Sequence, residues 1–255
     1  MMRKAFQIFG TAALALTLVT IAGSDVAAQG RGGAPQTPEA GAPIDLEGYW
    51  VAIVSEDWRW RMVTPPAGDF ASLPLNDEGE RVGNTWTPAM DGQCEAYGVG
   101  GLMRQPTRLL VTWADPNTLQ IETDAGSQAR QLHFTSMAPG AASLQGYSEA
   151  AWQQPARQGR GANAVQPPGG TLHVMTTNTT GGWLRKNGAP YSADAEVEEF
   201  FDRFPSPNGD EWLVITTIVA DPTYLNQPFI TSSHFKREAA AGAAVPANWN
   251  PTTCG

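Results

Sequence analysis

The 255-residue chain lacks most of the short motifs that would assign a reaction to it. It contains neither G-x-G-x-x-G nor G-x-x-x-x-G-K-[ST], so nothing in it supports nucleotide binding. Ser148 in GYSEA has no glycine two residues later and therefore does not form a nucleophile elbow. The three histidines show no H-x-H or H-E-x-x-H pairing, so we expect neither a metal site nor a cofactor.

Basic side chains are also scarce. The chain has 16 Lys and Arg residues against 25 Asp and Glu residues. Without residues 1–28, which contain Arg3, Lys4 and Asp25, 14 basic and 24 acidic side chains remain, a net charge of −10. Phosphate groups are bound by concentrated Lys and Arg, so this balance argues against nucleic acid and anionic membranes as partners.

A long apolar run occurs once, over residues 6–22. It follows a basic start and precedes small residues, which is the pattern of a secretory signal peptide over residues 1–28. The Gly/Pro/Ala-rich residues 29–43 predict a disordered linker. Because no second such run follows, we expect no stable membrane insertion after cleavage and a periplasmic or secreted protein.

Cysteine is limited to Cys94 and Cys254. In an exported protein, a pair of cysteines more often forms a disulfide than two free thiols. No Cys-His signature accompanies either residue, which argues against a catalytic thiol. We therefore predict a Cys94–Cys254 bridge that fastens the C-terminal end to the body of the protein.

Strand patterns dominate the chain after residue 43. Residues 49–62 alternate between apolar and polar side chains, and Asn208-Gly209-Asp210 is a hairpin turn signal. Seven further segments predict short strands: 108–113, 118–123, 129–134, 171–177, 195–203, 212–219 and 228–236. Many short strands at near-regular spacing are typical of an antiparallel sandwich or barrel.

Two other segments depart from the strand pattern. Asn76 followed by DEGERVGNTW predicts one short capped helix over residues 76–86. Residues 153–170 are polar and rich in Pro and Gly, which predicts a flexible insertion over one end of the barrel. We expect residues 44–255 to form a single domain.

LEGYW at residues 46–50 resembles the G-x-W first strand of lipocalin-like barrels. GWLRKNGAPYSADAEVEEFFDR and the following DEWLVITTIVADPTYLNQPF resemble a group of secreted bacterial proteins of unassigned function, as do GYSEAAW and TLHVMTT. The resemblance implies a calycin-type barrel and carries no catalytic residues. With the strand pattern, it predicts an all-β fold, an antiparallel lipocalin-like β-barrel with one short helix.

SEDWRWRM at residues 55–62 places two tryptophans, two arginines and two carboxylates together. If residues 49–62 form one strand, Glu56, Trp58 and Trp60 share the inward face with Trp50. The tryptophans would then offer stacking area to a ligand, and Glu56 would be a poorly solvated acid or base. Alternatively, the tryptophans fill the core and Glu56 pairs with an arginine. The outward set, Asp57, Arg59 and Arg61, predicts surface ion pairing.

Glu199 and His173 are further catalytic candidates. Val197, Glu199 and Phe201 share one parity, so we expect Glu199 to point inward, where a carboxylate must be paired or protonated. It forms a structural ion pair, with Arg130 or Arg185 as partner, or it transfers a proton. His173 is our choice among the histidines because it lies in a strand beside the insertion.

Residues 181–192 (GGWLRKNGAPYS) predict a loop at the barrel mouth with Trp183, Arg185 and Tyr191 as ligand contacts. Alternatively, the loop is an ordinary connection whose tryptophan covers the core. The leading hypothesis is therefore a barrel that binds a small apolar or aromatic molecule. A second is a cofactor-independent lyase, isomerase or hydrolase that uses Glu199 or His173 as general base. A third is a structural envelope protein with a filled barrel.

Overall fold

A computed structural model describes residues 36–238, 246 and 248–254. The predicted signal peptide and residues 29–35 of the predicted linker lie outside these residues. Residues 36–43 form a turn beside the barrel, where the indole nitrogen of Trp152 donates a hydrogen bond to the carbonyl of Pro38 at 2.9 Å. No helix in the described part of the chain is long and apolar enough to cross a membrane.

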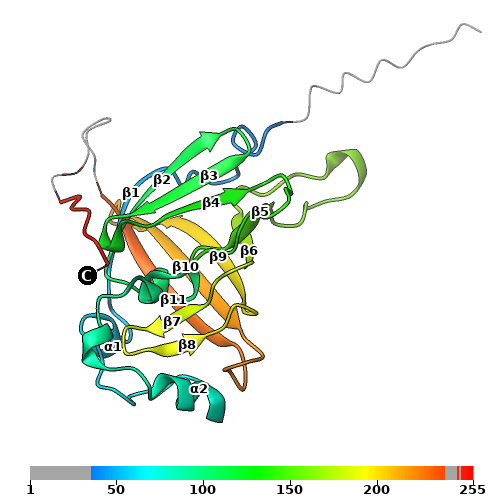
Figure 1. Cartoon of the computed structure of the whole chain (residues 1–255). Coiled ribbons are helices and arrows are strands. Elements are labelled where there is room, and N and C mark those ends of the chain that lie inside the picture. The colour runs from blue at the N-terminus through cyan, green and yellow to red at the C-terminus, as the bar shows by residue number, and fades with distance from the viewer. Residues whose placement is uncertain (1–35, 239–245, 247, 255) are drawn as a thin grey trace, which may run out of the picture. The chain divides into compact units, whose positions relative to one another are not determined.

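Nine strands close into a barrel in the order β1-β11-β10-β9-β6-β5-β4-β3-β2 (Figure 1). Their bounds are β1 Gly48–Ala52, β2 Arg108–Asp115, β3 Thr118–Thr123, β4 Ala129–His133, β5 Tyr147–Gln153, β6 Thr171–Thr177, β9 Glu196–Pro205, β10 Glu211–Ala220 and β11 Phe229–Arg237. The all-β barrel is confirmed, and seven of these strands overlap the seven short segments predicted from the alternation. β5 was not predicted as a strand.

The expectation of a purely antiparallel sheet needs correction. β4 and β5 run parallel, with Leu132 opposite Ser148, while the other neighbours are antiparallel. The reason is the connection between them, which carries the chain back from residue 134 to residue 146 before β5 begins. The predicted hairpin turn is present, because Asn208-Gly209-Asp210 joins β9 to β10 with Gly209 at φ 87°.

The predicted strand over residues 49–62 is wrong beyond Ala52. β1 ends there, and residues 58–61 form the one-turn helix α1 (Trp58–Arg61). The ladder between β1 and β2 ends at Val51 opposite Arg108, although β11 continues beyond its last pair with β1. The chain then leaves the sheet, and Asp57, with a left-handed φ of 52°, precedes α1.

The predicted helix is confirmed as α2 (Asp77–Gly83), whose first turn is capped by the side chain of Asn76. The expectation of a single helix is wrong, because α1 and α3 (Val99–Leu102) are also present. Four 3-10 turns complete the helical elements: η1 Pro88–Met90, η2 Cys94–Tyr97, η3 Ala125–Ser127 and η4 Gly161–Asn163.

The predicted loop at residues 181–192 is instead a hairpin of β7 (Gly182–Arg185) and β8 (Ala189–Tyr191). Gly188 provides the positive φ of 76° that the turn requires. The hairpin lies between the barrel and α2, at the end of the molecule that also carries α1 (Figure 1).

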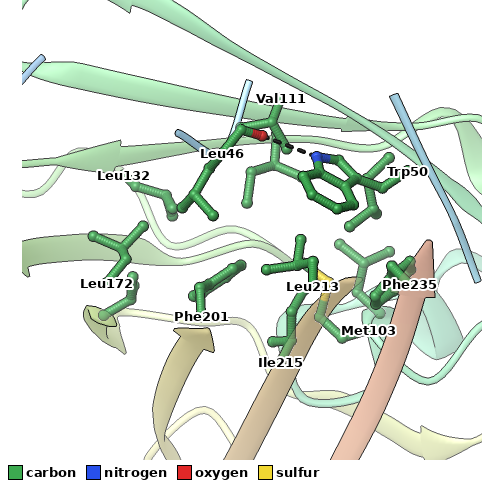
Figure 2. Close-up of a cluster of buried hydrophobic side chains, with 14 of the residues drawn as sticks. Leu46, Trp50, Met103, Val111, Leu132, Leu172, Phe201, Leu213, Ile215 and Phe235 are labelled. Carbon is green, nitrogen blue, oxygen red and sulfur yellow. Dashed lines mark hydrogen bonds between the residues drawn. The ribbon is translucent and has the colours of Figure 1, made fainter. Parts of the chain in front are cut away.

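Apolar side chains fill the barrel interior. Trp50, Phe201, Phe235 and leucines from several strands point toward one another from opposite walls (Figure 2). The buried indole of Trp50 donates to the carbonyl of Leu46 at 2.9 Å, which satisfies its one polar atom. A second apolar cluster, with Tyr191 and Val219 among its members, lies under the β7–β8 hairpin. These apolar side chains, together with the buried Arg130–Glu199 pair, occupy the barrel interior.

The disulfide between Cys94 and Cys254 is confirmed. It joins η2 to the C-terminal segment, and the backbone nitrogen of Thr252 also donates to the carbonyl of Asp124 at 2.8 Å. The predicted insertion at residues 153–170 contains an isolated bridge between Gln158 and Val165 beyond the end of β5. Its flexibility stays a prediction.

Candidate functional site

One edge of β11 is left unpaired where β1 ends. β1 pairs with β11 from Trp50 to Ala52, and the backbone nitrogen of Ile53 donates to the carbonyl of His234 at 2.8 Å, so the part of β11 from Phe229 to Ser233 has no neighbour on that side among the described strands. A pocket of about 480 Å³ lies along this edge, and we call it the β11 pocket. Its lining includes Glu56, Asp57, Arg61, Arg104, Phe229 and His234.

Arg61 reaches the pocket from the last turn of α1. It is only 4% exposed, although Trp58 on the same helix is 66% exposed. Its Nε donates to the carbonyl of Arg104 at 2.8 Å, while its Nη2 is buried without a hydrogen-bond partner. The helical turn therefore directs Arg61 into the protein, which corrects the prediction of a surface ion pair for this residue.

Arg104 follows α3 and is also buried. Its Nη2 lies 3.1 Å from an oxygen of Asp57, and its guanidinium lies 5.4 Å from the centre of the Phe229 ring. Asp57 has a left-handed backbone conformation with φ 52°, which an aspartate tolerates better than most residues. This conformation starts α1 and brings the carboxylate to Arg104.

Arg185 comes from β7 and is 2% exposed. All three of its guanidinium nitrogens are buried without a hydrogen-bond partner. Its guanidinium carbon lies 4.7 Å from the centre of the Trp60 ring. The Trp60 indole in turn donates to Asp69 at 3.2 Å. The structure thus brings together two predicted ligand contacts, Trp60 and Arg185.

These three arginines concentrate positive charge in a poorly solvated region. Burial, and to a smaller extent repulsion from Arg104, lowers the pKa of Arg61 and of Arg185 to about 10. Burial also lowers the pKa of Arg104, with Asp57 opposing the change. All three stay protonated at neutral pH, so the folded protein carries the cost of burying their charges.

Glu56 and Trp58 are not on the inward face that was predicted for them. Glu56 lies at the rim of the β11 pocket with its side chain 56% exposed, and one of its oxygens is 3.8 Å from Nδ1 of His234. Trp58 points outward from α1. The prediction failed because the strand ends at Ala52, so Glu56 lies in a bend and Trp58 in a helical turn, where the period of two no longer applies.

Glu199 points inward as predicted, and its partner is Arg130. Both side chains are fully buried, with the Glu199 oxygens 3.2 and 2.6 Å from the two terminal guanidinium nitrogens. The Arg130 side chain also contacts the hydroxyls of Ser148 and Thr176. This geometry is that of a structural ion pair, and Glu199 does not line the β11 pocket.

His173 lies on the outer face of β6, because its neighbours Leu172 and Val174 are the buried residues. Its Nε2 is 2.8 Å from Glu198, and its ring stacks on Phe200. His173 does not converge with Glu199. Among the described residues, no group of three or more His, Cys, Asp or Glu side chains is arranged to hold a metal ion.

Tyr191 and Trp183 belong to the β7–β8 hairpin. Burial raises the pKa of Tyr191 to about 12. The ring packs against Gly100, and a side chain at Gly98 would collide with the hydroxyl. Both aromatic residues line a second pocket, of about 510 Å³, beside the disulfide. They therefore belong to a different surface from the β11 pocket.

Sequence reasoning missed the importance of Arg61 and Arg104. Arg61 was assigned to the outer face of a strand, and Arg104 carried no motif.

Together the fold and the site define a closed β-barrel with an arginine-lined pocket in its wall. Comparison of the chain with protein-family models, curated proteins and solved structures gives no significant match. The resemblance to lipocalin-like and secreted bacterial proteins therefore stays a prediction.

Proposed function

We propose that this protein is an exported β-barrel that binds a small organic molecule through an anionic group, in the β11 pocket. The observation that carries the proposal is that Arg61, a buried side chain whose Nη2 has no hydrogen-bond partner, lines a pocket that reaches the surface. Arg104 lines the same pocket, and Arg185 adds a third buried positive charge nearby.

Arg104 is paired with Asp57, whereas Arg61 and Arg185 have no carboxylate partner among the described residues. A buried charge without a partner is unfavourable, and a carboxylate or phosphate oxygen supplies both the charge and the missing acceptor. Guanidinium groups bind such oxygens well because their donors form a planar fork. The volume of about 480 Å³ lies within the range of small-molecule sites.

The apolar part of the ligand has a place in the same pocket. Phe229 and Ile230 line it, and Ile230 is exposed. The predicted apolar or aromatic ligand is therefore retained, but its site moves from the barrel centre to the wall. The centre is occupied by the side chains of the core.

The test is calorimetric binding of a panel of aliphatic and aromatic carboxylates, amino acids included, each paired with its neutral amide. We expect at least one acid to bind while its amide does not. Arg61→Gln should weaken that acid by about tenfold or more, which corresponds to about 1.4 kcal/mol. Far-ultraviolet circular dichroism of the variant would verify its fold.

Arg59→Gln is the matched control. Arg59 belongs to the same helix, but its side chain is 67% exposed and pairs with Asp69 outside the pocket. We expect this variant to bind like the natural protein. Equal affinity for the acids and their amides would contradict the proposal. Equal losses of affinity in Arg61→Gln and Arg59→Gln would contradict it as well.

One alternative function, a structural envelope protein, is favoured by the side chains that occupy the barrel interior. That hypothesis predicts that no member of the panel binds. It also predicts that the arginines act only on stability, which the Arg185 variant discussed below examines. Glu199 and His173 offer less support for an enzyme, since one is enclosed and the other lies on the outer face.

A further inference from the structure

The β11 pocket is lined by positive side chains that are buried and by negative side chains that are more exposed. Its buried side presents Arg61 and Arg104, and its accessible side presents Glu56 and Asp57. These four side chains contribute equal numbers of positive and negative charges, and His234 is the remaining titratable residue that lines the pocket. A ligand with no net charge but separated charges matches this arrangement better than a simple anion does.

Glu56 is the carboxylate available to a ligand. Within the described residues it makes no hydrogen bond, and its nearest basic atom, Nδ1 of His234, is 3.8 Å away. Asp57 is already engaged, because one of its oxygens accepts from Arg104. Both carboxylates lie close enough to Arg61 to stabilise its charge. Glu56 therefore lies near Arg61, and its carboxylate oxygens can accept hydrogen bonds from a ligand.

A simple carboxylate in this pocket would approach Arg61 past two negative side chains. Like charges at short range repel each other, so both carboxylates oppose that approach. A protonated amine on the same ligand converts that repulsion into attraction. An amine without a carboxylate would leave Arg61 without its acceptor.

We infer that the ligand is a small zwitterion, with a carboxylate held by Arg61, a protonated amine facing Glu56 and an apolar portion against Phe229 and Ile230. An apolar α-amino acid has this chemistry. The inference rests on the proposed function and specifies the class of ligand for the same pocket.

Three matched probes separate the charges: phenylalanine, 3-phenylpropionate, which lacks the amine, and 2-phenylethylamine, which lacks the carboxylate. Calorimetry on the full protein at neutral pH and low salt would compare them. We expect phenylalanine to bind at least about tenfold more tightly than either of the others. Glu56→Gln should weaken phenylalanine several-fold and leave 3-phenylpropionate unchanged or tighter.

Glu80→Gln is the control variant, because Glu80 is exposed on α2 and does not line the pocket. It should leave all three affinities unchanged. If 3-phenylpropionate binds as tightly as phenylalanine and Arg61→Gln weakens both, the zwitterion inference fails and the anion site stands. If 2-phenylethylamine binds best and Arg61→Gln has no effect, both fail. Absence of binding by all three probes overturns the inference, while the wider acid panel still decides the proposed function.

Discussion

The guanidinium carbon of Arg185 lies 4.7 Å from the centre of the Trp60 ring, and none of its nitrogens has a hydrogen-bond partner. The contact joins the β7–β8 hairpin to α1. A desolvated cation–π contact contributes about 2 kcal/mol, whereas burying an unpaired charge costs several kcal/mol. Arg185 is therefore a residue whose position is poorly explained by stability alone.

Replacing Arg185 with methionine should leave the free energy of unfolding unchanged or raise it by about 1 kcal/mol. The substitution removes a buried charge and leaves no partner unpaired. Urea unfolding of the ligand-free protein measures the change. Arg130→Met is the informative comparison, because it leaves Glu199 buried without its partner and should cost about 3–5 kcal/mol. Equal losses in the two variants would show that Arg185 is a structural residue.

The Arg130–Glu199 pair gives a second prediction. Glu199→Leu should destabilise the protein by about 3–5 kcal/mol, because it leaves the Arg130 charge unpaired in the core. The double variant Arg130→Met/Glu199→Leu should recover most of that loss, since neither charge remains. A double-mutant cycle in urea measures the coupling. If the double variant lost as much stability as the two single variants together, the two side chains would not stabilise each other.

The raised pKa of Tyr191 predicts a loss of stability at alkaline pH. Burial raises its pKa from 10.0 to about 12, so the unfolded chain releases this proton first as the pH rises. The stabilisation is full below pH 10 and declines between pH 10 and 12. Between about pH 9 and about pH 11, the natural protein should lose about 1 kcal/mol more than Tyr191→Phe. Urea unfolding at the two pH values tests this, and parallel losses would contradict it.

The disulfide should contribute strongly to stability, because it closes a loop of 160 residues. Chain entropy gives an upper estimate of about 5 kcal/mol, and measured contributions are commonly about 2–4 kcal/mol. Urea unfolding of Cys94→Ser/Cys254→Ser against the oxidised protein measures the difference. A reductant should lower the stability of the natural protein to that of the variant and leave the variant unchanged. A reductant effect on the variant would point to another cause.

Much of the fold follows from local signals. β3 and β6 have the bounds that their alternation predicted, and Asn76 marks the start of α2. The inward position of Glu199 followed from the same period of two. These elements were predictable because each has a strand partner or a cap that agrees with its own sequence.

The candidate site was not predictable in the same way. Residues 55–62 were identified as a functional segment, but the side chains assigned to the interior were the wrong ones. Trp58 is exposed and Arg61 is buried, because the chain leaves the sheet after Ala52. A helical turn distributes side chains with a period of 3.6 residues and a strand with a period of two, so Trp58 and Arg61 exchanged their assigned faces while Arg59 stayed exposed.

The sequence by itself determined the strand-rich architecture, the acidic balance and the pairing of the two cysteines, because these depend on composition and on period over short distances. Only the tertiary structure decided that β1 ends early, that Arg61 and Arg104 line the pocket beside it, and that Arg185 is buried close enough to feel the charge of Arg104. The three arginines come from α1, the segment after α3, and β7. Their proximity depends on the pairing of the strands and on the position at which β1 ends. Long-range pairing of this kind is a property of the whole barrel and leaves no mark on any short stretch of the chain.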